Sequence, residues 1–229
     1  MRRLGLLGGM SWESTALYYR LLNEGVRDRV GGHASADLVL RSFDFAAVRA
    51  LQREQDWAGA GRLLGDAARG LVEAGAEVLL LCTNTMHLVA EAIETRAGLP
   101  LLHIGDATGA AVSAAGVRRV GLLGTAFTME RPFLRERLEG HGGEVVVPGT
   151  EDRALVDRII FDELVQGVVR EESRSALAGV LARLVDAGAE GVVLGCTEIE
   201  LLVGPADSPV PVFPTTRLHV DAALDAALG

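Results

Sequence analysis

The chain has 229 residues, of which 49% are hydrophobic, and a formal net charge of −9 at pH 7. This length suits one large α/β domain or two small ones, and the negative charge argues against nucleic acid as a partner, because phosphate binding needs clustered basic side chains. All 22 basic residues are arginine, so the chain can form neither an internal pyridoxal phosphate aldimine nor a Walker-type phosphate loop, both of which require lysine.

The N-terminal segment predicts a buried strand rather than a targeting signal. Residues 4–7 are apolar and follow Arg2 and Arg3, but the run is too short for a secretory signal and no cleavage site follows it. No apolar stretch approaches the roughly 18–20 residues that a membrane span needs. We therefore expect a cytoplasmic protein that does not associate with membranes.

Short apolar runs alternate with helical patterns along the whole chain. Leu63, Leu64, Leu71 and Val72, for example, recur at helical spacing. The continuous apolar runs predict parallel strands that are covered on both faces. They occupy residues 4–7, 38–40, 78–81, 101–104, 120–123, 145–147, 192–194 and 210–213. The alternation predicts an α/β fold built on parallel sheets.

The chain also repeats itself. Residues 2–8, Arg-Arg-Leu-Gly-Leu-Leu-Gly, are echoed by residues 118–124, Arg-Arg-Val-Gly-Leu-Leu-Gly. We therefore predict two similar lobes, one formed by residues 1–98 together with 214–229 and the other by residues 99–213. The carboxyl ends of their strands are expected to face a common cleft, because ligands bind at that edge of an open α/β sheet.

Two cysteines lie in similar frames, one in each predicted lobe. Cys82 ends one apolar run and precedes Thr-Asn, whereas Cys196 ends another and precedes Thr-Glu. The cysteines are one residue further apart than the Gly-Ala-Glu segments that begin the two frames. In a cytosolic chain two cysteines are more typical of catalytic or buried thiols than of a disulfide. A single free cysteine is often a small buried hydrophobe, but a matched pair indicates shared chemistry.

The frames suggest what the thiols do. Thr83 or Asn84, and Thr197 in the second frame, are expected to cap helices that follow the cysteines. A thiol at a helix N-terminus is expected to have a lowered pKa, and the N–H groups there can hold a carboxylate. Two thiols on opposite sides of one carbon, with sulfurs roughly 6–7 Å apart, can remove a proton from one face and donate one to the other. The sequence therefore predicts inversion of the α-carbon of an amino or hydroxy acid.

Several other residues allow two interpretations. The glycine-rich segment at residues 5–11 is either a tight turn or a ligand contact, and Gly124-Thr125 with Thr128 has the same ambiguity. His87 is expected to be a satisfied buried histidine rather than a catalyst. Glu198 either binds a substrate ammonium, tunes the neighbouring thiol or caps its own helix. The five histidines have no metal-ligand spacing, so we expect no metal.

Three motifs together resemble the cofactor-independent aspartate/glutamate racemase family. They are Gly-Leu-Leu-Gly-Gly-Met-Ser-Trp-Glu-Ser-Thr at residues 5–15, Cys-Thr-Asn-Thr-Met-His at residues 82–87 and Gly-Cys-Thr-Glu-Ile at residues 195–199. The resemblance implies an isomerase with two Rossmann-like lobes related by pseudo-twofold symmetry, a homodimer, no cofactor and a small amino acid as substrate. It also implies that Cys82 and Cys196 are the acid–base pair. The implied substrate-binding residues are Met10, Gln52, Thr83, Asn84, Thr85, Thr125, Thr128, Thr197 and Glu198.

The substrate side chain and the exact reaction stay open. Aspartate-selective members of the family hold the side-chain carboxylate with basic residues, and Gln166 stands near a position where a basic residue is often found. Arg49 and Arg53 are either compensating basic residues or exposed helix charges. The surroundings of residues 42–45 and Trp57 resemble those of the broad-specificity amino-acid racemases in the family. A pocket without a dedicated basic clamp is expected to discriminate weakly, because specificity depends on paired polar groups. Maleate isomerases, hydantoin racemases and arylmalonate decarboxylases are alternatives on the same fold, and the presence of two thiols disfavours the decarboxylases. A non-enzymatic protein that binds a small acid is a third possibility.

Overall fold

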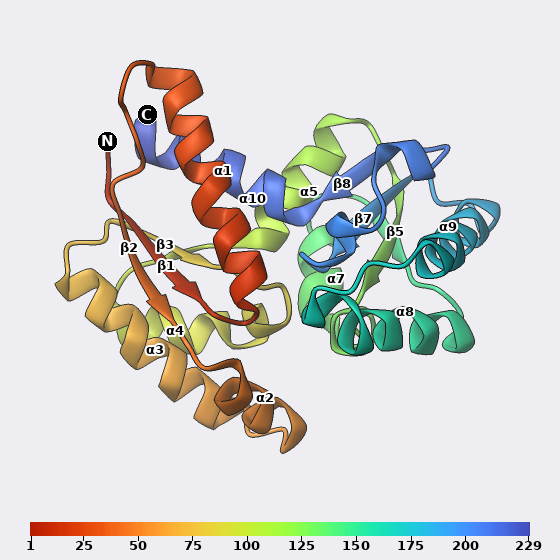
Figure 1. Cartoon of the computed structure of the whole chain (residues 1–229), viewed down its shortest axis with the longest axis horizontal. Helices are drawn as coiled ribbons and strands as arrows, with labels where there is room; N and C mark the ends of the chain where they lie inside the picture. Colours follow the sequence, from red (N-terminus) through yellow and green to blue (C-terminus); the bar gives the residue numbers. More distant parts are fainter. The chain divides into compact units, whose positions relative to one another are not determined.

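The computed structural model describes all residues, 1–229, and the chain forms two compact units (Figure 1). Unit 1 comprises Met1–His103 and His219–Gly229, and unit 2 comprises Ile104–Leu218. Each unit has its own four-stranded parallel sheet, which confirms the predicted α/β fold. Whether the predicted lobes, with boundaries after residues 98 and 213, are independent domains stays a prediction.

Unit 1 is built on a sheet in the order β2-β1-β3-β4. Its strands are β1 (Leu4–Gly8), β2 (Leu38–Ser42), β3 (Val78–Leu81) and β4 (Leu101–Leu102). Its helices are α1 (Trp12–Val30), α2 (Phe45–Arg53), α3 (Trp57–Glu73), the 3-10 helix η1 (Thr85–Val89), α4 (Ala90–Ala97) and most of α10 (Thr215–Leu228). All four predicted strands are present, although the fourth ends at Leu102 because helix α5 already begins at Ile104.

The side chains of the unit 1 strands enter two cores on opposite faces of the sheet. Leu4 and Leu6 of β1 pack in a core with residues of α1 and α10, such as Leu22 and Leu224. Leu7 belongs instead to the core formed with α3 and α4. Figure 1 shows α1 and α3 on opposite sides of this sheet. The period of two along a strand explains why a continuous apolar run is needed to fill both cores.

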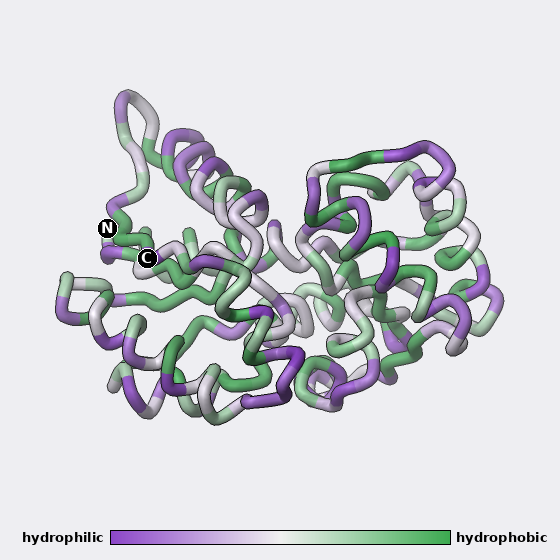
Figure 2. The backbone as a smooth tube through the Cα atoms, turned by 60° about the horizontal axis from the view of Figure 1, so that its bottom comes forward, coloured by the Kyte–Doolittle hydropathy of each residue, from purple (hydrophilic) through white to green (hydrophobic).

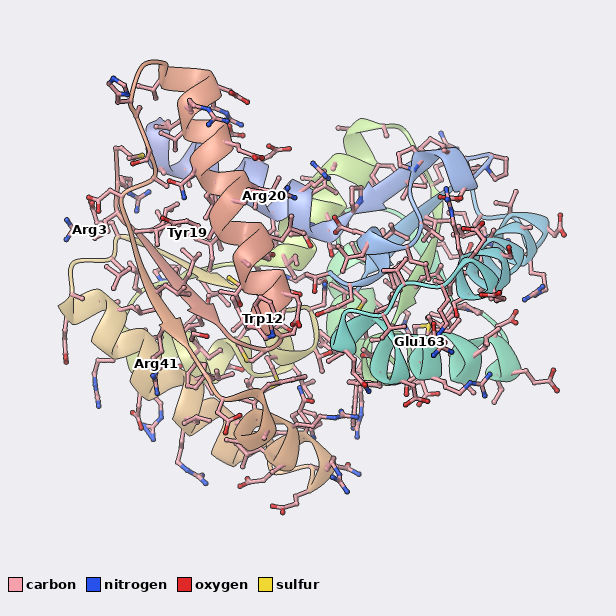
Figure 3. The ribbon with its side chains drawn as sticks, viewed as in Figure 1. Arg3, Trp12, Tyr19, Arg20, Arg41 and Glu163 are labelled. Atoms are coloured by element: carbon pink, nitrogen blue, oxygen red, sulfur yellow. The ribbon has the colours of Figure 1, made fainter.

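Helix α1 has one face buried against the sheet of unit 1 and one face exposed to solvent. Its N-terminus is capped by the Ser11 side chain, which accepts a hydrogen bond from the Ser14 N–H. Tyr18 is completely buried, whereas Trp12 and Tyr19 are 67% and 53% exposed (Figure 3). The packing of unit 1 therefore leaves these two aromatic side chains available to solvent.

Unit 2 repeats the arrangement with a sheet in the order β6-β5-β7-β8. Its strands are β5 (Arg119–Gly124), β6 (Glu144–Val146), β7 (Gly191–Gly195) and β8 (Val212–Pro214). Its helices are α5 (Ile104–Ala114), α6 (Ala126–Glu130), α7 (Pro132–Glu139), α8 (Thr150–Asp162) and α9 (Glu171–Asp186), with the 3-10 helices η2 (Leu164–Gln166), η3 (Ile199–Leu201) and η4 (Pro205–Asp207). None of the helices in either unit combines the length and apolar character that crossing a bilayer requires.

The sheet of unit 2 also fills a core on each face. Leu123 and Leu194 pack with residues of α8 and α9, whereas Leu122 and Val193 pack with residues of α5 and α7. In Figure 2 the tube is predominantly hydrophobic along the central strands of each unit and hydrophilic at many outer turns. This pattern is the one expected for a parallel sheet covered by helices on both faces.

The strand register locates the extra residue between the two cysteine frames. Leu7 pairs with Leu81 in unit 1, and Leu123 pairs with Leu194 in the corresponding strands of unit 2. Cys82 follows its leucine directly, whereas Gly195 separates the second leucine from the second cysteine. Successive side chains point to opposite faces, so Cys82 joins the core with α1 and α10, and the second cysteine joins the core with α8 and α9. The two frames are therefore similar in sequence but place their thiols on different faces of their sheets.

Candidate active site

Cys82 lies at the carboxyl end of β3, where the strand turns sharply. Its N–H donates to the carbonyl of Leu7 in the neighbouring strand at 2.9 Å, and the N–H of Thr83 donates to the carbonyl of Leu81 at 2.8 Å. The second bond spans three residues and places Cys82 at the centre of a γ-turn, and its φ is not positive, so the turn is of the inverse kind common at strand ends. The side chain is completely buried.

The polar residues after Cys82 form a buried loop. Thr83, Asn84 and Thr85 are each less than a tenth exposed. Asn84 stands at the start of η1, but its side chain does not cap that helix, and the first α-helix of this region begins only at Ala90. The expectation of a capped α-helix directly after Cys82 was therefore wrong, because the chain first makes a 3-10 turn.

Burial raises the pKa of the Cys82 thiol well above its usual range. The expectation that a helix N-terminus lowers the pKa of Cys82 was therefore wrong. The helix dipole acts through the N–H groups of the first turn, and here that turn is a short 3-10 segment with no charged partner beside the sulfur. The desolvation of the thiolate is then the dominant effect.

Met10 and Gln52, two residues of the predicted pocket, are also buried in unit 1. Met10 and Met86 belong to the core formed with α3 and α4. Gln52 lies on α2, where its amide donates to the Met86 sulfur at 3.0 Å and its carbonyl accepts from Arg49 at 3.2 Å. The structure thus connects Gln52 to the loop that follows Cys82. Its role toward a substrate stays a prediction.

The glycine-rich segment after β1 is a tight turn held by its own hydrogen bonds. The N–H of Gly9 donates to the Thr15 hydroxyl at 2.7 Å. Gly9 has a φ of +84°, and a Cβ on it would approach the carbonyl oxygen of Phe43 to 2.3 Å. Only glycine fits this backbone conformation and this close approach. The need for a tight turn is enough to explain the glycines of this segment, and a direct contact with a ligand stays a prediction.

Cys196 follows β7 in unit 2 and has an acidic partner. Its Sγ lies 3.1 Å from Oε2 of Glu198, and the hydroxyl of Thr197 donates to the same oxygen at 2.7 Å. All three residues are buried. The next helix is the 3-10 helix η3, which has Glu198 rather than Thr197 at its N-cap and no side-chain cap hydrogen bond. The expected cap by Thr197, and an α-helix at this point, were therefore wrong.

Burial and the Glu198 carboxylate raise the pKa of the Cys196 thiol. The hydrogen bond from the thiol to Glu198 acts in the same direction, because it stabilises the protonated sulfur, whereas two backbone N–H groups oppose the shift. Of the three roles considered for Glu198, the geometry favours tuning of Cys196. The thiols of the two units therefore differ in chemical environment: burial acts on both, but only Cys196 has a carboxylate beside it.

Thr125 and Thr128 lie at the neighbouring strand end in unit 2. The hydroxyl of Thr125 caps α6 by accepting from the N–H of Thr128 at 3.3 Å, and the two hydroxyl oxygens are 3.1 Å apart. Gly124, directly before them, pairs with Gly195, directly before Cys196. The structure therefore brings both predicted threonines to the edge of the sheet that carries Cys196.

One acidic residue near this edge was missed by the sequence analysis. Glu200 lies on η3, and its Oε1 accepts from the N–H of Thr216 at the start of α10 at 3.0 Å. Burial raises the pKa of its carboxyl to about 7. An acidic residue two positions after Glu198 gives no signal of burial by itself, because its partner Thr216 lies 16 residues further along the chain, in the helix that follows β8.

Removing the Glu198 charge is expected to ease ionisation of Cys196. In a Cys82→Ala background, Glu198→Gln should lower the pH midpoint of thiolate absorbance by about one unit, because a like charge next to the sulfur is lost. The same substitution in the otherwise unaltered chain should slow a proton transfer that uses Cys196 as the donor about tenfold, since the proton on Cys196 is no longer held for donation. Glu172→Gln, an exposed acid on α9, serves as the control. An unchanged or raised midpoint would contradict the role given to Glu198.

Comparison with known proteins identifies the family. The family model described as Asp/Glu/Hydantoin racemase matches residues 7–223. The chain belongs to this family. A glutamate racemase from Synechococcus sp. is 31% identical over 127 residues, which are 55% of this chain and 45% of the relative. The chain spans less than half the length of the glutamate racemases that it matches.

Solved structures agree with the fold over the whole chain. A candidate Asp/Glu racemase from Yersinia pestis has a TM-score of 0.94 and 51% identity, and covers 100% of both chains. An aspartate racemase homologue from Pyrococcus horikoshii has a TM-score of 0.87 and 33% identity, again over 100% of both chains. The predicted resemblance to the aspartate/glutamate racemase family is therefore confirmed.

Proposed function

We propose that this protein is a cofactor-independent amino-acid racemase that uses Cys82 and Cys196 as its acid–base pair. The observation that carries the proposal is the position of the two thiols. Each lies at the carboxyl end of a central strand, β3 or β7, in sheets with corresponding strand orders. This edge is where open α/β sheets bind ligands. Membership of the Asp/Glu/Hydantoin racemase family supports the same reaction class.

The proposed reaction is a transfer of two protons at one carbon. One thiolate removes the α-proton of the substrate, which leaves a carbanion next to the carboxylate. The other thiol donates its proton to the opposite face, so the centre is inverted and the two sulfurs have exchanged protonation states. No aldimine with a lysine of the chain can assist, because the sequence contains no lysine.

The different surroundings of the thiols predict which sulfur holds the proton at rest. Glu198 accepts a hydrogen bond from Cys196 and disfavours its ionisation. No corresponding charge acts on Cys82, whose pKa is raised by burial alone. In the proposed resting state Cys196 is therefore the thiol, and Cys82 becomes the thiolate that removes the first proton.

The buried polar residues beside the thiols are the proposed substrate contacts. Thr83, Asn84 and Thr85 follow β3, and Thr197 follows β7, so all four lie where N–H and hydroxyl donors can hold the α-carboxylate. Met10, Gln52, Thr125 and Thr128 complete the proposed pocket. Gln166, exposed on η2, supplies no charge to a substrate side chain. We therefore propose broad specificity rather than selection for aspartate.

Solvent exchange tests the proposed reaction without knowledge of the substrate. The purified full chain is incubated in D2O with single L- and D-amino acids, and the α-proton signal is followed by NMR together with the enantiomeric composition. Loss of the signal with inversion, and without any added cofactor, is expected for the preferred amino acids. If no amino acid in the panel exchanges its α-proton, the racemase proposal fails, and maleate and hydantoins become the next substrates to test.

We also propose that the protein works as a homodimer in the cytoplasm. The exposed Trp12 and Tyr19 on α1 support a self-association surface, because large aromatic side chains are enriched at protein interfaces. Light scattering of the full chain in solution tests the dimer, and a monomer at all concentrations would refute it.

A further inference from the structure

The interior of unit 1 contains a polar cluster that the proposed reaction does not use. It consists of Tyr18, His87, His103 and His219, all buried. The ring centroids of His87 and His103 are 4.5 Å apart, and those of His87 and His219 are 5.9 Å apart. The chain has no group of histidine, cysteine and acidic side chains arranged to hold a metal ion, so the cluster needs another explanation.

Hydrogen bonds assign the protons in this cluster. Nε2 of His219 is 2.8 Å from the carbonyl oxygen of Leu102, which can only accept, so Nε2 carries the proton. In the neutral ring Nδ1 is then an acceptor, and it receives the hydroxyl of Tyr18 at 2.8 Å. By the same reasoning Nδ1 of His87 carries a proton and donates to the carbonyl oxygen of Thr83 at 2.8 Å.

The His87 hydrogen bond ends directly beside the first proposed catalytic thiol. Thr83 follows Cys82, and its N–H closes the γ-turn on which Cys82 sits. A turn closed by a single hydrogen bond leaves the following peptide group free to rotate. The side chain of His87 fixes the Thr83 carbonyl, and the His87 N–H also bonds the carbonyl of Asn84 at 3.1 Å. His87 therefore sets the orientation of the peptide group between Thr83 and Asn84, the second peptide group after Cys82.

Charge is not the means by which His87 acts on Cys82. A protonated imidazole would favour the thiolate, but burial, together with His103 and His219, lowers the pKa of His87 well below its usual range. Burial likewise lowers the pKa of His219 to about 4. Both rings are therefore neutral at pH 7, and neutral rings can approach one another without repulsion. The contribution that remains to His87 is geometric.

We propose that His87, packed against His103 and His219, is a positioning residue that anchors the Thr83 carbonyl and thereby fixes the direction of the Cys82 thiol. The effect on turnover rests on the proposed racemase function. The effect on the Cys82 loop does not, so the two can be tested separately.

Two substitutions separate the hydrogen bond from the packing of the ring. His87→Asn removes the ring but keeps an N–H donor at the same distance along the side chain as Nδ1. His87→Phe keeps a buried ring against His103 but has no donor. His33→Phe, at an exposed histidine of the same unit, is the control. Thermal unfolding of each variant establishes the temperature at which it is fully folded, and the later measurements are made below it.

The readout independent of activity is the alkylation of Cys82 by iodoacetamide, followed by mass spectrometry in a Cys196→Ala background. We expect His87→Phe to increase the rate about tenfold, because opening of the buried loop is no longer opposed by the bond to Thr83. His87→Asn and His33→Phe should leave the rate close to that of the background. Equal rates for the Phe and Asn variants, or a faster rate for Asn, would overturn the proposal.

The second readout is steady-state racemisation with Cys196 intact. His87→Phe should lower kcat about 100-fold, as expected for a misplaced catalytic group, whereas His87→Asn should retain most of kcat. If Phe retains more of kcat than Asn, the ring matters only as core packing and the positioning role is refuted. If the unaltered chain racemises nothing but the alkylation rates differ as expected, the proposed function fails while the anchoring of the Cys82 loop stands.

Discussion

Replacement of Cys82 or Cys196 by alanine is expected to lower the rate of racemisation by about three orders of magnitude. This size lies within the contribution that a positioned general acid or base makes to a proton transfer. Each thiol is needed in both directions of the reaction, because one sulfur takes the proton and the other returns one. Circular dichroism of the amino acid measures the rate, and melting of each variant shows that it is folded.

Deuterium exchange gives the two cysteine variants a matched internal control. A chain that keeps one thiol can remove the α-proton only from the enantiomer whose proton faces that sulfur, and it can return only to the same face. We therefore expect Cys82→Ala and Cys196→Ala to exchange the α-proton of opposite enantiomers without inversion. Exchange of the same enantiomer by both variants, or inversion at the original rate by either, would refute the two-thiol mechanism.

Glu200→Gln is expected to stabilise the protein above neutral pH by about 3 kcal/mol. Burial raises the pKa of Glu200 from an ordinary value of 4.5 to about 7 in the folded chain. Above pH 7 the carboxyl is ionised in both states, so the folded state carries the full penalty of the buried charge. As the pH falls through 7 the folded state takes up the proton first, and below about 4.5 the penalty has gone. Glutamine is neutral throughout and can still accept from Thr216.

Urea unfolding at several pH values checks this prediction. The difference in unfolding free energy between Glu200→Gln and the unaltered chain should be largest near pH 8 and should vanish near pH 4.5. Glu136→Gln on α7, where the acid is exposed, should show no such pH dependence. A destabilised Glu200→Gln protein at pH 8 would show that the hydrogen bond to α10 outweighs burial. A buried acid retained at a cost to stability, two residues after Glu198, is typical of a functional region.

The sequence predicted the strands well because burial on both faces leaves a simple signal. All eight apolar runs correspond to strands, and the errors are confined to their ends. The run at residues 101–104 stops at Leu102, since Ile104 begins a helix, and β8 includes Pro214 beyond the predicted run. Pattern alone does not locate such ends, because an apolar residue fits either a strand or the first turn of a buried helix.

The sequence predicted which residues form the candidate site but not the direction in which the pKa values of its thiols are shifted. The motifs located both thiols, yet the expected fall in thiol pKa depended on α-helices that the structure replaces by the 3-10 helices η1 and η3. The opposite faces of Cys82 and Cys196 follow from the single residue Gly195, whose effect appears only once the register with β5 is known. The contact between His87 and His219 joins residues that are far apart in the chain, so no local sequence pattern predicts it.

The nested order of the two units has a consequence for synthesis on the ribosome. Unit 1 is interrupted after His103 and resumes only at His219, so all of unit 2 is translated before unit 1 is complete. The final 14-residue helix α10 supplies Val220, Leu224 and their neighbours to the core under α1, and the N–H of Arg2 pairs with the carbonyl of Ala227 near the end of the chain. Until helix α10 has left the exit tunnel, one face of the first sheet stays partly uncovered.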